Sequence, residues 1–300
     1  MLKSIRVLLA GLVDYAGLFP PAGLAMAPAV QNYAAYRAGP TAWALGRFIL
    51  PVTRLAEFED TVAPYGASAA AEPWRLSVLG SGDLSADLHQ IRAFNQRHSA
   101  NVTTSVVVID TIELKATEAQ AITEALRLLD GQVQPYFEVP IHVDPRDLIT
   151  ALHGTSGRAK VRTGGTSADL FPTTEDLVRF IVACGAAQVP FKATAGLHHP
   201  LRSVQRLTYA PDSPTGSMYG FLNVFLTAAL LHAGLPPNEA PQVLEEPHWD
   251  AFTFTDDHVT WRDHQLDVAT LLHVRQHVAQ SFGSCSFDEP INDLKAVNML

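Results

Sequence analysis

Residues 159–196 carry the clearest sign of the fold and read AKVRTGGTSADLFPTTEDLVRFIVACGAAQVPFKATAG. The stretch opens with a strand-like run at 159–163 and closes with a second one at 189–194. Between the two runs, residues 172–176 (PTTED) are typical of a helix start, because acidic residues suit the positive end of the helix dipole. The pattern predicts a strand–helix–strand unit of the kind that joins parallel strands.

The same alternation extends toward the amino terminus. Further strand-like runs lie at 8–15, 43–51, 74–79, 104–110 and 136–141. Helical segments lie between them at 84–98, 113–129 and 145–153. No Gly-x-Gly-x-x-Gly turn marks a dinucleotide-binding sheet, so seven strand–helix steps predict an α/β protein with a closed (β/α)8 barrel of the TIM type.

The eighth strand is not evident in the sequence. A long loop is expected at 200–217 and a strongly apolar helix at 219–233. The segment 252–261 alternates in polarity around two aspartates, which predicts a β-hairpin, and a last helix is expected at 265–281. We expect one barrel domain over residues 1–300, with 236–300 as a C-terminal helix and hairpin elaboration.

Composition excludes several classes of protein. Hydrophobic residues make up 47 % of the chain and charged residues 17 %, which requires a large buried core. The net charge is −9 and no Lys/Arg block occurs, so nucleic acid is not an expected partner. No apolar run reaches the ~20 residues of a membrane span. Two cysteines fit a reducing compartment, so we expect a cytoplasmic protein. The expected partner is a small-molecule substrate, and the protein can form a homo-oligomer.

Lysine is scarce, and its placement is unusual. The chain has 16 Arg and 5 Lys, and two of the lysines, Lys160 and Lys192, lie in strand-like runs. A lysine that is desolvated or next to a second cation has a lowered pKa and can attack a carbonyl to form a Schiff base. The alternative is a lysine at the barrel rim that pairs with a carboxylate or phosphate.

The residues around these lysines form two short motifs. The first is Lys160-Val-Arg-Thr163-Gly164, and the second is Phe191-Lys192-Ala-Thr-Ala-Gly196. Both motifs resemble those of class I aldolases of the deoxyribose-phosphate aldolase type. The resemblance implies that Lys160 is the Schiff-base nucleophile and Lys192 the cation that lowers its pKa. It also implies that Thr163 and Gly164 border the substrate, and that no metal or other cofactor is needed.

A third segment, Phe282-Gly283-Ser284-Cys-Ser286, is similar to the phosphate-binding end of the same family. The resemblance implies that Gly283, Ser284 and Ser286 hold an anionic group. The chain departs from the family after Gly196, where 197–202 (LHHPLR) replaces a second glycine and a basic turn.

Carboxylates and one arginine complete the expected site. Glu138 lies in a strand and is costly to bury unless Lys160 pairs with it, so we expect it to act as acid and base. Asp110 can serve the same role or cap a helix. Asp14 also follows an apolar run. Arg162 alternates with Lys160, so it points to the same face, where it can hold an anion or form an interior salt bridge.

His198 and His199 follow a strand and can contact the substrate, act as a base or bond within a loop. With Glu138 and His142, one of them can also supply metal ligands. The preferred hypothesis is therefore an aldolase-like lyase that acts on a small carbonyl compound, which can carry an anionic group, through an imine with Lys160. The alternatives are a metal-assisted lyase or isomerase and a non-catalytic barrel that binds a small anion.

Overall fold

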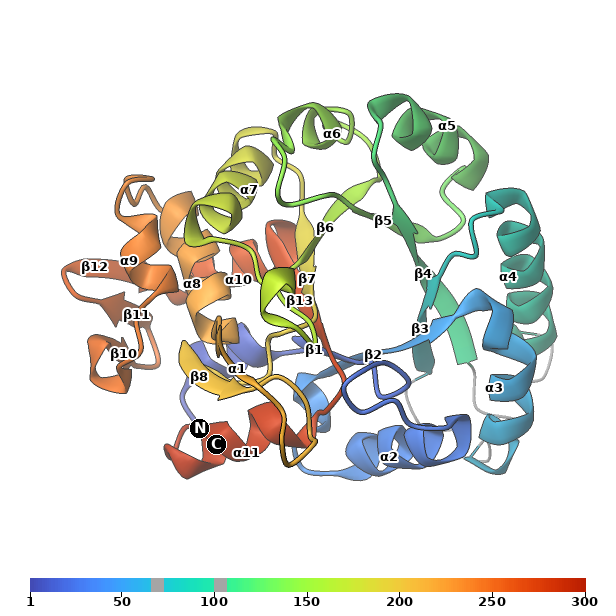
Figure 1. Ribbon diagram of the computed structural model, residues 1–300, viewed down its shortest axis with the longest axis horizontal. Helices are drawn as coiled ribbons and strands as arrows, with labels where there is room; N and C mark the ends of the chain where they lie inside the picture. The colour runs from blue at the N-terminus through green and yellow to red at the C-terminus, as the bar shows by residue number, and fades with distance from the viewer. Residues whose placement is uncertain (66–72, 100–106) are drawn as a thin grey trace.

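A computed structural model describes residues 1–65, 73–99 and 107–300. Its centre is a closed barrel of eight parallel strands in the order β1-β13-β7-β6-β5-β4-β3-β2 (Figure 1). The strands are β1 (Val13–Tyr15), β2 (Leu45–Pro51), β3 (Trp74–Leu79), β4 (Val107–Lys115), β5 (Gln134–Glu138), β6 (Arg158–Arg162), β7 (Phe191–Thr194) and β13 (Ala279–Ser284). The predicted (β/α)8 barrel is confirmed.

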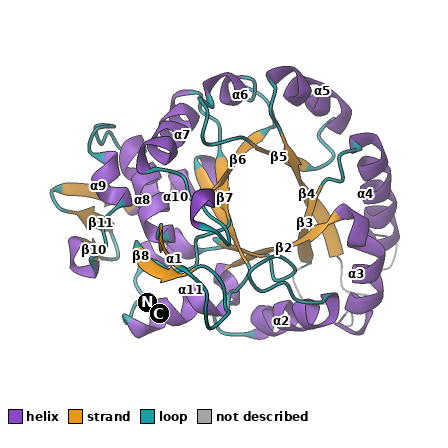
Figure 2. Cartoon of the chain, in the orientation of Figure 1, coloured by secondary structure: helices purple, strands orange, loops and turns teal. Residues whose placement is uncertain are grey.

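Helices surround this barrel (Figure 2). They are α1 (Lys3–Leu9), α2 (Met26–Ala38), α3 (Leu55–Val62), α4 (Leu84–Ser99), α5 (Ala119–Leu129), α6 (Arg146–Thr150), α7 (Thr174–Ala186), α8 (Phe221–His232), α9 (Ala240–Leu244), α10 (Val268–His277) and α11 (Asp288–Ala296). Short 3₁₀ turns are η1 (Ala42–Ala44), η2 (Val52–Arg54), η3 (Ala63–Tyr65), η4 (Ala168–Leu170) and η5 (Trp249–Ala251). Helix α7 starts as the sequence predicts, because the Thr173 hydroxyl accepts a hydrogen bond from the Asp176 amide at 3.1 Å.

The strands that carry the two lysines follow a strict alternation. Ala159, Val161 and Ala193 belong to the apolar core between the strands and the outer helices. Successive side chains of a strand point to opposite faces, so Lys160 and Lys192 point into the barrel. The outward residues of these strands are apolar because the surrounding helices cover them, whereas the inward positions carry the two lysines.

The connection between β7 and β13 holds most of the added structure. It contains the hairpin β8 (Ser203–Arg206) and β9 (Thr215–Met218) within the segment expected to be a loop. Helix α8 is buried along its length from 221 to 230, which explains why it is apolar all round. The predicted hairpin at 252–261 is confirmed, and a further strand extends it into a three-stranded antiparallel sheet. Its strands are β10 (Phe252–Phe254), β11 (His258–Trp261) and β12 (His264–Asp267).

The helix predicted at 265–281 is wrong at both ends. Residues 264–267 form β12, and Ala279 begins β13, the eighth strand of the barrel. Strand β13 pairs with β1 on one side and β7 on the other, with Phe282 fully buried. Because β13 lies within 236–300, only part of that segment is added to the barrel.

Two further boundaries differ from the prediction. The run at 8–15 is the end of α1 followed by the short strand β1. Strand β4 continues to Lys115, so Glu113 lies in a strand and not in the helix predicted at 113–129. Residues 104–106 of the predicted strand lie outside the described residues.

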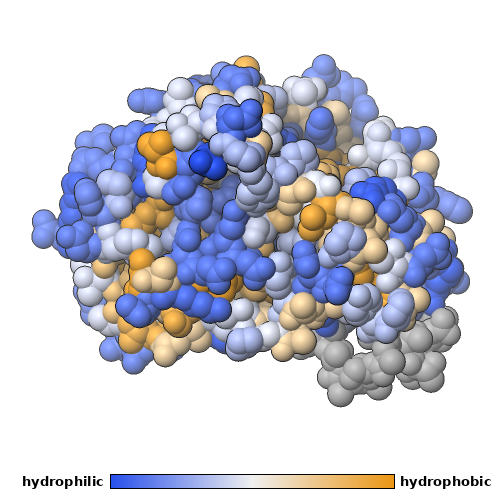
Figure 3. Space-filling model, turned by 60° about the horizontal axis from the view of Figure 1, so that its bottom comes forward, coloured by the Kyte–Doolittle hydropathy of each residue, from blue (hydrophilic) through white to orange (hydrophobic). Residues whose placement is uncertain are grey.

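The outer surface mixes polar and apolar residues, as the face drawn in Figure 3 shows. Large exposed hydrophobic side chains lie on separate elements, such as Leu128 on α5 and Leu272 on α10. None of the helices in the described ranges is long and apolar enough to cross a bilayer.

Candidate active site

Four charged residues lie in one row across neighbouring strands of the barrel. The register pairs Lys115 of β4 with Glu138 of β5, Glu138 with Lys160 of β6, and Lys160 with Lys192 of β7. Residues paired in this way have the same orientation, and adjacent strands are ~4.8 Å apart. The row therefore brings together residues that are up to 77 positions apart in sequence (192 − 115).

Lys160 lies between two carboxylates. Its Nζ is 2.7 Å from Glu113 Oε2 and 2.7 Å from Glu138 Oε2. Glu113 comes from β4, two positions before Lys115. The Ser77 hydroxyl donates to Glu113 Oε1 at 2.7 Å and fixes that carboxylate from β3. Lys160 is thus held by residues of the two preceding strands.

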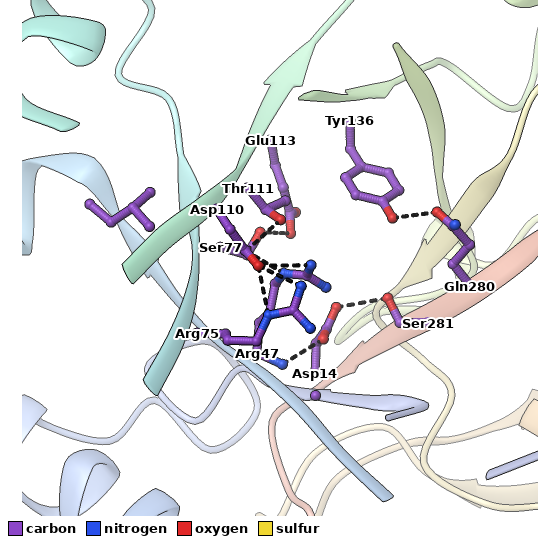
Figure 4. A network of polar contacts seen from close by, with 12 residues as sticks. Asp14, Arg47, Arg75, Ser77, Asp110, Thr111, Glu113, Tyr136, Gln280 and Ser281 are labelled. Atoms are coloured by element: carbon purple, nitrogen blue, oxygen red, sulfur yellow. Dashed lines mark hydrogen bonds and ion pairs between the residues drawn. The ribbon is translucent and has the colours of Figure 1, made fainter. Parts of the chain in front are cut away.

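Lys192 lies deeper in the barrel and is completely buried. Its Nζ donates to Glu113 Oε1 at 2.8 Å and to Asp14 Oδ2 at 2.6 Å. Asp14 also accepts hydrogen bonds from the Ser281 hydroxyl and the Arg47 amide (Figure 4). The Glu113 carboxylate therefore binds both lysines, one on each oxygen.

These contacts keep the groups charged. Burial favours neutral Glu113, but Lys160 and Lys192 outweigh burial and hold the pKa of Glu113 far below its usual 4.5. Burial likewise favours neutral Lys192, yet Asp14 and Glu113 outweigh it and raise the pKa of Lys192 above 10.5. The interior therefore contains carboxylates and ammonium groups in alternation, the arrangement that makes buried charge tolerable.

A cavity of about 390 Å³ opens at the carboxyl ends of the strands. The charged side chains in its wall are Glu113, Lys115, Glu138, Lys160 and Arg162. Its remaining wall is Ala16, Phe19, Pro20, Pro21, Ile49, Leu79, Gly165, Thr166, Leu170, Thr194, Ala195, Gly196, His198, Gly283 and Cys285. An adjoining hollow of about 360 Å³ shares Glu113, Lys115, Glu138 and Lys160. Lys192 lines neither space, so Lys160 is the member of the lysine pair that a small molecule can reach.

Two cations at the cavity mouth are weakly engaged. Arg162 has a side chain that is 44 % exposed, and its Nε lies 3.6 Å from Glu138 Oε1, beyond hydrogen-bond distance. Lys115 is exposed and forms no ion pair within the part of the chain that the structure describes. Both side chains therefore have donors available for an anionic group in the cavity.

Thr163 and Gly164 support the site without lining the cavity. The Thr163 hydroxyl donates to the carbonyl oxygens of Ala195 at 2.5 Å and Thr194 at 3.3 Å, which ties the end of β6 to β7. Gly164 lies against Gly196, where a Cβ on Gly196 would come within 2.7 Å of the Gly164 Cα. Thr163 and Gly164 therefore pack one strand end on the next, and neither is among the residues that line the cavity.

Only one of the three residues expected to hold an anion at the end of β13 lines the cavity. Gly283 lines the cavity at the end of β13. Ser284 is buried, and its hydroxyl accepts a hydrogen bond from the Ser286 amide. The Ser286 hydroxyl in turn accepts from the Glu289 amide at the start of α11. Neither serine lines the cavity, and each hydroxyl accepts a hydrogen bond within the turn between β13 and α11.

Asp110 does not belong to the site. It lies in the first half of β4, where its carboxylate pairs with Arg47 at 2.6 Å and Arg75 at 2.5 Å. Figure 4 shows both guanidinium groups turned toward it. Neither the acid–base role nor the helix cap expected for Asp110 fits, because two arginines occupy the carboxylate within a strand.

The histidines are separated from one another. His198 lines the cavity, whereas His199 pairs with Asp293 at 2.6 Å and lines a different hollow. His142 is exposed and lies 3.5 Å from Asp176. The metal-ligand set considered from the sequence is not assembled, and no three His, Cys, Asp or Glu side chains in the described ranges are placed to hold an ion.

The sequence does not identify Glu113 and Cys285 as site residues, and it marks Asp14 only as a carboxylate after an apolar run. A signal for Glu113 exists in the alternation of Thr111, Glu113 and Lys115 with Ile112 and Leu114, which continues the strand beyond Asp110.

The fold and site together define a (β/α)8 barrel with a lysine–carboxylate centre at the carboxyl ends of its strands. No protein-family model matches the chain, and no curated protein does. A similar solved structure is the muconate lactonizing enzyme from Klebsiella pneumoniae, with 11 % identity and a TM-score of 0.28 over 91 % of this chain. The match covers 66 % of that enzyme, so the chain spans just under two thirds of its length. The barrel assignment rests on the strand order and not on this likeness.

Proposed function

We propose that the protein is an aldolase-like lyase that binds a small carbonyl compound as an imine with Lys160. One observation carries the proposal: Lys160 is the reachable member of a buried lysine pair, and two carboxylates lie 2.7 Å from its Nζ in a cavity wall. Imine formation needs an amine that can lose a proton and a nearby group to receive it.

The chain provides the proton acceptor in Glu138. Burial favours the neutral acid, but Lys160 and Arg162 outweigh it and lower the pKa of Glu138, which is therefore a carboxylate at rest. It takes a proton from the Lys160 ammonium, and the free Nζ attacks the carbonyl carbon. Glu138 returns the proton to the resulting alkoxide, which gives the carbinolamine hydroxyl. It then takes a second proton from the nitrogen and delivers it to this hydroxyl, which leaves as water. The nitrogen of the resulting iminium ion draws electrons from the neighbouring carbon–carbon bond.

Glu113 and Lys192 are positioning residues in this proposal. Lys192 is closed off from the cavity and acts on Lys160 through the shared Glu113 carboxylate. Its fixed positive charge holds the Glu113 carboxylate that also contacts Lys160. Loss of Lys192 is expected to slow imine formation without removing the nucleophile.

The substrate is expected to carry an anionic group. Arg162 and Lys115 lie on the strands that flank Glu138, and both line the cavity that contains Lys160. Their free donors fit a carboxylate or a phosphate. A cavity of about 390 Å³ is in the lower part of the range for small-molecule sites, which favours a compact substrate.

The test is chemical trapping of the imine. Purified protein is treated with borohydride in the presence of acetaldehyde, pyruvate or glyceraldehyde 3-phosphate, and the intact mass and labelled peptide are measured. We expect an adduct on Lys160 that is absent from Lys160→Met and retained in Lys295→Met, a matched exposed lysine on α11. An adduct that persists in Lys160→Met, or wild-type protein without an adduct for any probe, refutes the proposal.

A further inference from the structure

A second polar cluster lies in the cavity wall, on the side of β7 and β13. His198 follows β7 and has only 9 % of its surface exposed. Its Nδ1 lies 2.9 Å from Glu289 Oε2, in the first turn of α11. His198 lines the cavity together with Lys160 and Cys285. The imidazole is therefore held at Nδ1 by Glu289 in a residue that lines the cavity.

Glu289 is fixed by several contacts. The Tyr209 hydroxyl, from the turn between β8 and β9, donates to the same Oε2 at 3.0 Å. The Glu289 amide donates to the Ser286 hydroxyl, and the positive end of α11 favours a negative charge at this position. Burial favours the neutral acid, but the hydrogen bond from His198 and then that from Tyr209 outweigh it and lower the pKa of Glu289.

An ionised Glu289 determines the tautomer of His198. A carboxylate can only accept, so the proton of the neutral imidazole resides on Nδ1. The Nε2 atom then carries a lone pair, and no side chain or backbone group in the described ranges bonds to it. This arrangement of a carboxylate, an oriented imidazole and a free Nε2 is the one that general bases use.

We propose that His198, oriented by Glu289, is the catalytic acid–base group for the substrate hydroxyl on the far carbon of the carbon–carbon bond being cleaved. The inference rests on the proposed function, in which Lys160 forms the iminium ion. His198 Nε2 takes the hydroxyl proton, the oxygen forms a carbonyl, the carbon–carbon bond breaks, and its electron pair moves to the iminium to give an enamine. In the reverse direction, the enamine attacks an aldehyde and protonated His198 donates its proton to the new alkoxide.

The position of His198 fits a role that is separate from that of Glu138. Strand β6, which carries Lys160, lies between β5 with Glu138 and β7, which leads to His198. Glu138 is bound to Lys160 and is placed to serve the nitrogen and the carbinolamine oxygen. A proton on a more distant oxygen of the substrate needs a different group, and His198 borders the same cavity on the other side of β6.

Acetaldehyde is the probe for the test, because it can form the imine and then condense with a second molecule. Borohydride trapping measures the imine, exchange of its methyl protons in D₂O measures the enamine, and NMR measures 3-hydroxybutanal as the product of carbon–carbon bond formation. In His198→Ala we expect an unchanged adduct and unchanged exchange, with condensation reduced ~10²–10⁴-fold. Added imidazole is expected to restore condensation in this variant, which loss of a structural role would not allow.

His199→Ala is the matched control, because His199 pairs with Asp293 and faces another hollow. It is expected to behave as wild type in all three measurements. Condensation that is unaffected in His198→Ala overturns the inference and leaves the proposed function intact. A parallel loss of adduct, exchange and condensation that imidazole does not restore also overturns it. Wild-type protein that forms no adduct overturns the proposed function and this inference with it.

Discussion

Replacing Lys192 by Met tests how the buried charges depend on one another. The change keeps an unbranched side chain of similar length but removes the ammonium group that donates to Asp14 and Glu113. Both carboxylates then stay buried with one cation fewer. Breaking a buried pair by removing one partner costs about 3–5 kcal/mol. Asp14 keeps Ser281, and Glu113 keeps Lys160, so we expect a loss near the middle of that range, about 4 kcal/mol.

The assay is thermal and urea unfolding of the wild type and the variant. Unfolding entropy is ~2.1 cal/mol/K per residue, so a loss of ~4 kcal/mol in a chain of 300 residues lowers Tm by about 6 °C. A double-mutant cycle with Glu113→Gln, which restores the charge balance, is expected to recover about 1–3 kcal/mol as coupling. Additive effects of the two changes would mean that the pair does not interact.

The loss of stability in Lys192→Met should decrease as the pH falls. The pKa of Glu113 is depressed in the folded wild type, so its stabilising effect is present above the usual value of 4.5 and is lost as pH falls toward the folded pKa. Without Lys192, the folded variant takes up protons at higher pH than the wild type. The stability gap is therefore largest near pH 8 and narrows as the pH falls through the usual value of 4.5. A gap below about 1 kcal/mol at pH 8, or one that widens on acidification, would refute the reasoning.

Three further outcomes follow from the geometry. Arg162→Met and Lys115→Met should each weaken capture of pyruvate about tenfold and leave capture of acetaldehyde unchanged. Capture is measured by the concentration dependence of borohydride trapping, and equal effects on both probes would contradict an anion-binding role. Gly196→Ala should cost about 2–4 kcal/mol in urea unfolding, because φ is +76° and the new methyl meets Gly164; a neutral effect would contradict the close approach. Asp110→Asn should lose about 1–2 kcal/mol of stability and keep full adduct yield, whereas a lost adduct would return Asp110 to the site.

The barrel could be predicted because its strands alternate regularly with helices. Strand β13 could not, since its sequence (AQSFGS) has one large apolar residue among small and polar ones. Its inward positions face a crowded, polar barrel interior, where Ser281 donates to Asp14 and Gly283 approaches Ile49 and Thr194. A strand that fills such positions with small side chains lacks the β-branched and aromatic composition by which strands are recognised.

The site was predicted in part. Lys160 and Glu138 were expected to meet, because strands that are consecutive in a barrel are neighbours. The predicted helix begins at Glu113, whereas the structure has Glu113 in β4; acidic residues are uncommon in strands, so composition alone does not indicate this position. Its burial depends on Lys160 and Lys192, which are 47 and 79 positions later, and no local pattern encodes those partners. The same holds for His198, whose partner Glu289 is 91 positions away.

The alternation of charge suits the reaction proposed for Lys160. Well-packed apolar residues often replace a buried ion network without loss of stability, so such a network is weak evidence for stability as its purpose. A protonated imine carries the same single positive charge as the lysine ammonium, at the same nitrogen. Glu113 and Glu138, already 2.7 Å away, can therefore stabilise the iminium ion with little rearrangement. Lys192 keeps Glu113 ionised and in place throughout, which explains why a fully buried lysine that cannot reach a substrate would belong to the site.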